Sequence, residues 1–346
     1  MATANVRTDL KVPLEPVCWT PPVDLGLTGR YAPTGVPTAL QLWPLPGHGP
    51  EDVAVDADGA VFTGIERGAV LRLTDAGRTI STVADTGARP AGIEIDQNGS
   101  LIVCDSRRGL LRVQPSSGKV TTLVSEVGGR PLVFTNNASI AADGSVYFTD
   151  SSTKFSIHNY TGDLLEGRAT GRLLRWSPTE GVEVVLDGLR FANGVALSAD
   201  QSFAVVAETA GYRVRKLHLQ GPAAGQTEVL LDNLPGMPDN ISLGADGIFW
   251  IAFPSTRNKL LDRLLPRAGA IRRAVWAMPE KLSPKPSKVI LVMGMTGDGT
   301  VRHVIFAPAT SEFHQVTGVR EHDGWLYLGS LVSGAIARFR APAATA

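Results

Sequence analysis

The chain has few cysteines and no excess of charge of either sign. Of its 346 residues only 2 are cysteine, Cys18 and Cys104, which excludes a disulfide framework; whether these two pair cannot be deduced from the sequence. Lys and Arg together number 33, as do Asp and Glu, so the formal net charge is zero. A nucleic-acid-binding protein normally shows a basic excess or stripe, and the balance therefore argues against nucleic acid as a partner.

Long apolar segments and aromatic residues are also scarce. No apolar run reaches the roughly 18 residues that a membrane-spanning helix needs, and residues 1–22 contain no run typical of a signal peptide. On these grounds we expect a cytoplasmic protein. Aromatic residues make up 6% of the chain, whereas Gly and Pro number 37 and 23, which indicates many turns.

A repeated pattern runs through most of the sequence. Its unit is a pair of short runs of alternating apolar residues, joined by an Asp or Asn that is followed by Gly or, once, by Gln. This combination is the strongest short-range signal for a β-hairpin, because these residues tolerate the positive φ of a tight turn. The six turn residues are Asp58, Asn98, Asp143, Asp200, Asp246 and Asp323.

Each predicted hairpin is followed by a second pair of strand-like runs, such as 70–73 with 80–83 and 173–176 with 182–186. Six repeats of four strands predict an all-β fold, a six-bladed β-propeller. The alternative, a β-sandwich with hairpins, does not repeat so regularly. The sixth unit ends at Phe339 without a fourth strand, which residues 39–43 are expected to supply, closing the ring. We therefore assign 1–36 as an N-terminal extension and 37–346 as a single propeller domain.

Two spacings between turns are long and predict insertions at about 151–171 and 254–288. The second insertion carries nine basic residues, and its apolar residues recur at helical spacing: Leu260, Leu261, Leu264, Leu265, Ile271 and Val275. We expect a short helical insertion over one face of the propeller. It would be either a solvated helix pair, or a lid or plate in peripheral contact with a membrane.

Oxygen-bearing side chains recur at one offset in the repeats. Seven residues before the turn residue stand Glu51, Asn136, Asn193 and Asp239 in four units, with Ala91 and Val316 in the other two. Equivalent positions of successive blades surround the central channel, so these four side chains would face one axis. Two carboxylates and two amide carbonyls suit a hard divalent cation, Ca²⁺ first, whereas the lack of His and Cys at this offset disfavours zinc. Asx residues also simply form turns before strands, and Asn193 could do only that.

The next position in each unit offers further candidates. Asn240 could add a ligand to the same ion. Asp52 and Asn137 could hold a second, structural ion deeper in the channel, or support the ligands of the first.

Several motifs resemble one family. They are Gly-Pro-Glu-Asp at 49–52, Phe-Thr-Asn-Asn at 134–137, Arg-Phe-Ala-Asn-Gly at 190–194 and Pro-Gly-Met-Pro-Asp-Asn at 235–240, with further matches at 147–152 and 321–329. Together they resemble the strictosidine synthase-like or adipocyte plasma membrane-associated protein family. This family falls within the calcium-dependent phosphotriesterase superfamily, with senescence marker protein-30, gluconolactonases and paraoxonases. The resemblance covers about 40–339 and implies a six-bladed propeller with a catalytic calcium held by Glu51, Asn136, Asn193 and Asp239.

Departures from the family pattern bear on the chemistry. The glutamate that carries condensation in plant strictosidine synthases is matched here by His314. The family usually has Asp where this chain has Asn137, which weakens the case for the second ion. Our first hypothesis is a Ca²⁺-dependent hydrolase of a small-molecule lactone or ester, with Asp239 or His314 as the base or nucleophile. The alternatives are a condensing enzyme or lyase like strictosidine synthase, and a non-catalytic binding propeller with a structural metal.

Overall fold

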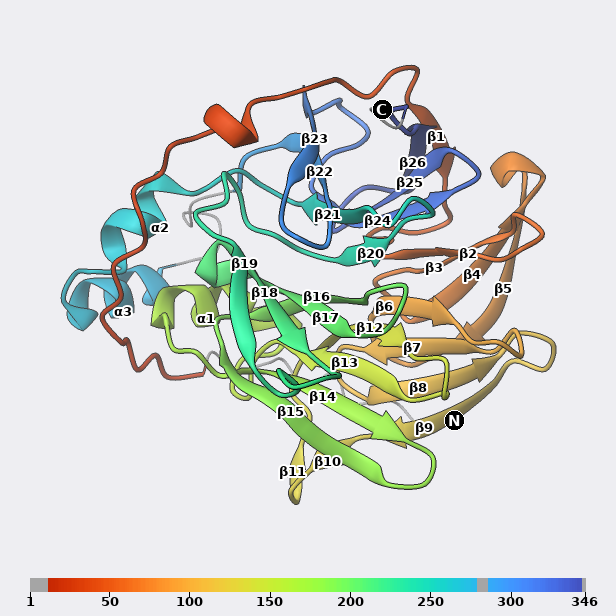
Figure 1. Ribbon diagram of the computed structural model, residues 1–346, viewed down its shortest axis with the longest axis horizontal. Helices are drawn as coiled ribbons and strands as arrows, with labels where there is room; N and C mark the ends of the chain where they lie inside the picture. Colours follow the sequence, from red (N-terminus) through yellow and green to blue (C-terminus); the bar gives the residue numbers. More distant parts are fainter. Residues whose placement is uncertain (1–11, 279–285, 344–346) are drawn as a thin grey trace.

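The computed structural model describes residues 12–278 and 286–343, and its strands form six four-stranded antiparallel sheets arranged as the blades of a propeller (Figure 1). The predicted fold class is confirmed. Each of the first five blades is built from four strands that follow one another in the sequence. In the first three blades these are β2 (Val53–Val55), β3 (Val61–Gly64), β4 (Ala69–Thr74) and β5 (Thr79–Asp85); β6 (Pro90–Ile95), β7 (Leu101–Asp105), β8 (Gly109–Gln114) and β9 (Lys119–Val124); and β12 (Thr135–Ile140), β13 (Val146–Asp150), β14 (Gly171–Ser177) and β15 (Gly181–Leu189).

The remaining blades follow the same order, except that the last one takes its fourth strand from the other end of the chain. A two-stranded hairpin, β10 (Glu126–Val127) with β11 (Arg130–Pro131), lies between the second and third blades in the sequence. The strands of blades four to six are β16 (Ala192–Leu197), β17 (Phe203–Glu208), β18 (Arg213–His218) and β19 (Thr227–Leu231); β20 (Ile241–Leu243), β21 (Phe249–Phe253), β22 (Val289–Met295) and β23 (Val301–Pro308); and β24 (Val316–His322), β25 (Trp325–Ser330), β26 (Ala335–Arg340) and β1 (Gln41–Pro44).

The predicted turn chemistry is present in the hairpins between the first two strands of each blade. The glycine after the turn residue has a positive φ in five blades, for example 81° at Gly59. In the fourth blade Gln201 takes this place with φ 57°. The turns are therefore specified locally, by residues that tolerate the left-handed region.

Strand β1 closes the ring as predicted. It pairs antiparallel with β26, with Gln41 opposite Arg338 and Pro44 opposite Ala335. The Arg338 guanidinium lies 4.6 Å from the ring centroid of Trp43 and 4.2 Å from that of Trp325. The first and last strands of the propeller are thus joined by backbone pairing and by cation–π contacts.

The two insertions form the helical face of the propeller, on the left in Figure 1. The first contains the 3₁₀ turn η3 (Ile157–Asn159) and α1 (Tyr160–Glu166), and the second contains α2 (Lys259–Leu264) and α3 (Gly269–Ala277). The ring of Phe155 meets that of Trp276 edge-on at 6.2 Å, so the insertions pack on one another. The remaining short 3₁₀ turns are η1 (Gly29–Tyr31), η2 (Asp75–Gly77) and η4 (Thr209–Gly211).

The described part of the N-terminal extension, 12–36, crosses this helical face. The Val17 amide donates to the Glu166 carbonyl at 2.8 Å, and the Trp276 indole donates to the Val12 carbonyl at 3.0 Å. Further along, the Thr34 amide donates to the Val304 carbonyl of β23 at 2.8 Å. We call residues 12–36 the strap. Residues 1–11 of the extension and 279–285 of the second insertion lie outside the described residues.

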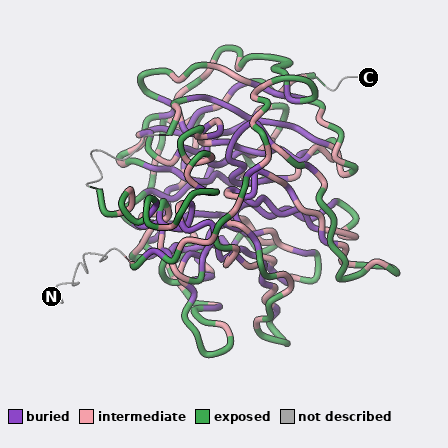
Figure 2. Tube along the Cα trace, turned by 90° about the vertical axis from the view of Figure 1, so that its left-hand side faces the viewer, coloured by how far each residue is buried: buried purple, intermediate pink, exposed green. Residues whose placement is uncertain are grey.

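The inner strands are buried, whereas the turns and much of the insertion helices are exposed (Figure 2). Cys104 is buried in β7, Cys18 is exposed on the strap, and both are free thiols. Among the described residues no helix has the length and apolar character needed to cross a membrane. The predicted cellular location stays a prediction.

Candidate metal centre

The four predicted ligands stand at or just before the innermost strands of four blades. Glu51 and Asp239 precede β2 and β20, whereas Asn136 and Asn193 lie inside β12 and β16. In both amide-bearing strands the pairing register shifts at this point, between Thr135 and Ala138 and between Ala192 and Val195. Such bulges turn side chains out of the regular alternation, and here they aim two amides at the channel.

Neighbouring ligand segments come very close to one another. A Cβ atom added to Gly194 would lie 2.3 Å from the Ile241 nitrogen and 2.5 Å from the Asp239 carbonyl oxygen. No real side chain fits at such distances, so glycine is required beside Asn193. The close approach brings the segments that carry Asn193 and Asp239 together at the axis.

Each of the four side chains has a buried oxygen without a hydrogen-bond donor. These atoms are Oε2 of Glu51, Oδ1 of Asn136, Oδ1 of Asn193 and Oδ1 of Asp239. Burying a polar atom without a partner is costly, and such atoms are rare in folded proteins. They occur in all four predicted ligands, around one pocket, so the residues present fit a cation there.

Two hydroxyl groups fix the orientation of the amides. The Asn136 Nδ2 donates to Ser151 Oγ at 2.9 Å, and this hydroxyl donates to the Ala192 carbonyl at 2.6 Å. In the next blade Asn193 Nδ2 donates to Thr209 Oγ1 at 3.1 Å, which donates to the Pro238 carbonyl at 2.7 Å. With their nitrogens engaged, both amides direct an oxygen toward the pocket.

Glu51 and Asp239 place two buried carboxyl groups near each other, and a positive charge beside them would stabilise their ionised forms. Burial raises the pKa of Asp239 well above its usual range, and the nearby Glu51 charge raises it further. Burial also raises the pKa of Glu51, opposed by the guanidinium of Arg89, whose Nε lies 2.8 Å from Glu51 Oε2. This ion pair lacks hydrogen-bond geometry, and one guanidinium does not neutralise two carboxylates.

The donor set fits a hard divalent cation. Two carboxylates and two amide oxygens are the ligands that Ca²⁺ prefers. Within 12–278 and 286–343 no cluster of three or more His, Cys, Asp or Glu is present, as a site for a softer metal would need. Glu51, Asn136, Asn193 and Asp239 would hold the ion.

Asn240, the fifth predicted ligand, does not line the pocket that the other four share. Its side chain is buried, and both its Oδ1 and its Nδ2 lack a partner. The structure therefore brings together four of the five residues predicted to bind the metal.

The predicted second ion has little room, because protein donors already engage its ligands. Asp52 Oδ2 accepts hydrogen bonds from Asn137 Nδ2 and from the Ile93 amide, both at 3.2 Å. Asn137 Oδ1 accepts from the Val195 amide at 3.0 Å. These two side chains link the inner strands of the first four blades directly, so we assign them a structural role without a metal.

The predicted catalytic residues differ in position. Asp239 lines the pocket. His314, the other candidate, does not line it, although the neighbouring Gln315 does. The side chain of His314 is partly buried, its Nδ1 lacks a partner, and burial together with the Lys288 charge lowers its pKa. A neutral imidazole at neutral pH follows, and its catalytic role stays a prediction.

The pocket opens to solvent, and the space among its lining residues, open solvent included, is about 570 Å³. The ends of the second insertion contribute Pro254, Ser255 and Pro286, so this insertion stands at the channel mouth, where we predicted a lid. Sequence reasoning missed the apolar wall, for which three residues give a signal, since Phe134, Phe191 and Met237 each stand two residues before a predicted ligand. The wall comprises Phe134, Ile157, Leu164, Phe191, Met237 and Leu331.

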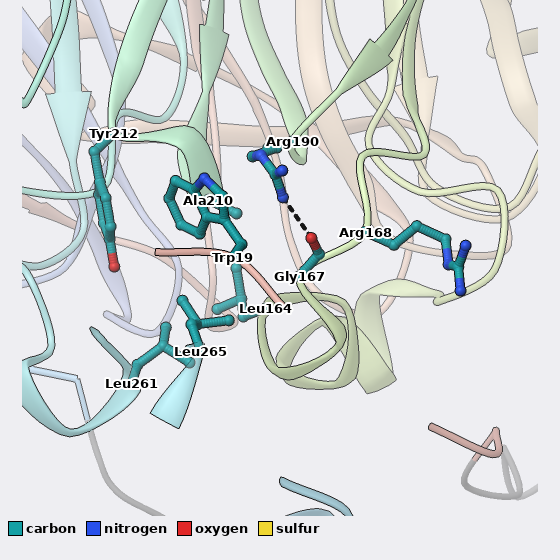
Figure 3. A pocket seen from close by; sticks show the side chains of 9 residues that line it. All are labelled: Trp19, Leu164, Gly167, Arg168, Arg190, Ala210, Tyr212, Leu261 and Leu265. Atoms are coloured by element: carbon teal, nitrogen blue, oxygen red, sulfur yellow. Dashed lines mark hydrogen bonds between the residues drawn. The ribbon is translucent and has the colours of Figure 1, made fainter. Parts of the chain in front are cut away.

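A second, smaller pocket lies behind Leu164, which lines both (Figure 3). Here the strap residue Trp19 lies against Arg190, whose guanidinium is 4.6 Å from the indole ring and whose Nη1 donates to the Gly167 carbonyl. The strap thereby holds α1, and with it one wall of the larger pocket.

Comparison with known proteins agrees with this arrangement. Family models described as strictosidine synthase and as strictosidine synthase-like, N-terminal match residues 136–222 and 29–73. The adipocyte plasma membrane-associated protein of Gallus gallus is 34% identical over 364 residues, covering 97% of this chain and 85% of the relative. The strictosidine synthase-like protein 13 of Arabidopsis thaliana is 43% identical over 171 residues, covering 49% of this chain and 42% of the relative.

Solved structures share the fold at low sequence identity. A gluconolactonase from Xanthomonas campestris superposes with a TM-score of 0.64 at 18% identity, covering 97% of this chain and 99% of that one. The calcium-binding protein regucalcin from Agrobacterium tumefaciens gives 0.63 at 14% identity, covering 88% and 95%. The chain thus shares the six-bladed propeller fold of these proteins. It belongs to the strictosidine synthase-like family that includes the adipocyte plasma membrane-associated proteins.

Proposed function

We propose that this protein is a Ca²⁺-dependent hydrolase of an ester or lactone. The observation that carries the proposal is the set of four buried oxygens without a hydrogen-bond donor around one pocket, from Glu51, which is ion-paired with Arg89, and from Asn136, Asn193 and Asp239. A gluconolactonase and a calcium-binding regucalcin among the neighbours in fold support the same reading.

The bound ion would supply Lewis acidity toward a carbonyl oxygen and lower the pKa of water. The rest of the chemistry falls to the side chains of the chain. Asp239 lines the pocket beside the other ligands, and its carboxylate is the acceptor we propose for a proton from attacking water. The apolar wall of the pocket excludes bulk water from the reacting groups.

The test is a panel of phenyl acetate, a γ-lactone and a phosphotriester, assayed with Ca²⁺ and after chelation with EGTA. We expect hydrolysis that is lost on chelation, restored by Ca²⁺, and reduced about a hundredfold or more in Asp239→Asn. His314→Ala, assayed in parallel, decides whether the imidazole shares in proton transfer.

Thermal unfolding provides a readout of the metal that does not depend on activity. A ligand at a hundred times its dissociation constant stabilises the native state by about 2.7 kcal/mol, so Ca²⁺ should raise the melting temperature of chelated protein. Unchanged melting would contradict the metal centre. Ca²⁺-dependent melting without any hydrolysis would point instead to a propeller with a structural metal, and condensation of an amine with an aldehyde to a condensing enzyme.

A further inference from the structure

A positive side chain lies against Glu51, one of the four proposed metal ligands. Arg89 Nε is 2.8 Å from Glu51 Oε2, and the two side chains are only 11% and 5% exposed. Arg89 directly precedes β6, so its guanidinium reaches Glu51 from the second blade. The second and sixth blades flank Glu51, and at the ring offset they carry Ala91 and Val316, which have no side-chain oxygen. On this side of the ring, Glu51 therefore has a cation as its neighbour.

Backbone carbonyls hold the Arg89 guanidinium in this place. Its Nη2 donates to the Leu331 carbonyl after β25 at 2.7 Å and to the Gly49 carbonyl before β2 at 3.3 Å. Gly49 has φ 68°, and a Cβ atom added to it would lie 2.5 Å from Arg89 Nη2 and 2.9 Å from the Leu331 oxygen. Glycine thus leaves the room that the guanidinium occupies. Neutral groups from two blades tether the cation, independently of Glu51.

The contact between Arg89 and Glu51 is one of charge rather than of a directed hydrogen bond. Both Arg89 Nε and Glu51 Oε2 are buried, and neither has a partner with hydrogen-bond geometry. A well-aligned charge-assisted bond would occupy the carboxylate oxygen. Here the guanidinium offsets the charge of Glu51 and leaves Oε2 available as a ligand.

The charge balance of the centre decides how Arg89 affects an ion. Glu51 and Asp239 together would balance the charge of Ca²⁺, and the guanidinium beside them adds one positive charge in excess. Like charges a few ångströms apart repel strongly in a protein, because water screens them little there. Without an ion, the same guanidinium offsets part of the charge of two buried carboxyl groups, whose burial is costly. Arg89 therefore favours the ion-free protein over the loaded one.

Resting on the proposed metal centre, we infer that Arg89 is a resident counter-charge that competes with Ca²⁺ for Glu51. It stabilises the protein when no ion is bound and lowers the affinity of the centre for Ca²⁺. The ion then binds reversibly, and the occupancy of the centre responds to the free Ca²⁺ concentration. Arg89 is a positioning residue, because it acts on the ion through Glu51.

Calorimetric titration with Ca²⁺ and with Tb³⁺, on protein freed of metal with EGTA and desalted, tests the inference. Arg89→Gln removes the charge but keeps a donor for the carbonyls, and should tighten Ca²⁺ binding about 10- to 100-fold. Repulsion scales with the charge of the ion, so Tb³⁺ binding should tighten about 30- to 1000-fold. A merely structural role would not produce this excess for Tb³⁺. Arg89→Lys keeps the charge and should bind both ions within about threefold of wild type.

Arg257→Gln is the matched control. Arg257 is buried, pairs with Asp262 at 2.9 Å and donates to the Pro22 carbonyl at 2.7 Å, but it does not line the pocket. This variant should lose stability and keep the wild-type affinity for both ions.

Urea unfolding measures the other half of the inference. In EGTA, Arg89→Gln should unfold at a lower urea concentration than wild type, because two buried carboxyl groups have lost their counter-charge. In excess Ca²⁺ the difference should disappear, since the ion supplies the charge. If the variant is unfolded in EGTA without urea, we expect it to refold when Ca²⁺ is added.

The inference and the proposed function fail on different results. Unchanged or weaker Ca²⁺ binding in Arg89→Gln, an equal gain for both ions, or a variant that stays unfolded in Ca²⁺ would overturn the role of Arg89 and leave the hydrolase standing. Tighter binding with the excess for Tb³⁺, but without hydrolysis of any ester or lactone, would refute the hydrolase and support the counter-charge. Absence of Ca²⁺ binding in wild type and variant alike would refute both.

Discussion

At the scale of single residues, the metal centre depends on two hydroxyls that are not themselves ligands. Ser151 follows β13 and Thr209 follows β17, the same place in consecutive blades. Each accepts from an amide nitrogen and donates to a backbone carbonyl of the next blade. An amide freed from its hydroxyl could present its nitrogen to the cation, and this would repel it.

We therefore expect Ser151→Ala and Thr209→Val each to weaken Ca²⁺ binding about 10- to 100-fold, as loss of groups that orient ligands generally does. Calorimetric titration of chelated protein measures the effect. Ser242→Ala is a matched control, since its buried hydroxyl also donates to a carbonyl of the next blade, that of Val319 at 2.6 Å. An equal loss in the control would show that the effect is general destabilisation.

The convergence of Glu51, Asn136, Asn193 and Asp239 on one pocket could be predicted from the sequence because propeller blades repeat, so that one offset in every repeat reaches the same axis. The groups that orient and surround them could not. Arg89 reaches Glu51 from the next blade, and Ser151, which holds Asn136, is itself fixed by its bond to the Ala192 carbonyl of the following blade, so both contacts depend on how the blades pack. The apolar residues of the wall, such as Phe134, carry no ligand chemistry and therefore gave no comparable signal in the sequence.

At the scale of elements, a buried carboxyl group connects the two ends of the first insertion. Asp163 of α1 interacts with Ser152 and Thr170, which stand near the two ends of the predicted insertion. Burial, aided by the charge of Glu166, raises the pKa of Asp163 from 3.8 to about 7. The carboxyl is thus neutral in the folded state at mildly acidic pH, whereas in the unfolded chain it is ionised.

A raised carboxyl pKa stabilises the fold at low pH, and this contribution is lost as the pH rises from about 4 through about 7. Asp163→Asn cannot ionise and should remove that part of the pH dependence. We expect wild type to lose about 1–4 kcal/mol of unfolding free energy relative to the variant between pH 4 and pH 8. Urea unfolding of both chelated proteins at several pH values tests this, and parallel pH profiles would contradict it.

Ring closure by β1 is a second feature at this scale. Trp43 is buried, meets the Tyr327 ring edge-on at 5.7 Å and is covered by Arg338. Truncating a buried Trp removes about 3–5 kcal/mol, so Trp43→Ala should unfold at a clearly lower urea concentration. Leu25→Ala, exposed on the strap, serves as the control. Equal stability of Trp43→Ala and wild type would show that the strand pair contributes little.

The elements themselves were largely predictable, because turn chemistry and helical spacing are local. The helical spacing of the leucines predicted α2, and that of Ile271 and Val275 predicted α3. How both insertions pack on each other and under the strap was not predictable. Contacts such as that of the Arg272 Nη1 with the Val17 and Glu166 carbonyls join segments far apart in the sequence.

At the scale of the whole molecule, the helical face combines apolar and basic groups. Leu260 and Ile271 are 47% and 48% exposed, beside basic residues such as Lys259 and Arg263. The predicted membrane contact through 254–288 stays a prediction. We expect binding to vesicles with anionic lipid, weakened in Leu260→Glu/Ile271→Glu and by salt. Cosedimentation tests it, with Val184→Glu, exposed on β15, as the control; absence of wild-type binding would refute it.

The strand that closes the ring also sets a constraint on synthesis. Gln41 of β1 and Arg338 of β26 are 297 residues apart in the sequence. A ribosome therefore releases β1 long before it has made the partner strand, and β1 must wait with unpaired backbone groups while five blades form. Contacts this distant in sequence form slowly, and an unpaired edge can meet other chains. Pairing of β1 with β26 thus closes the ring of the folded protein, but until the last blade has been made the unpaired β1 exposes the nascent chain to aggregation.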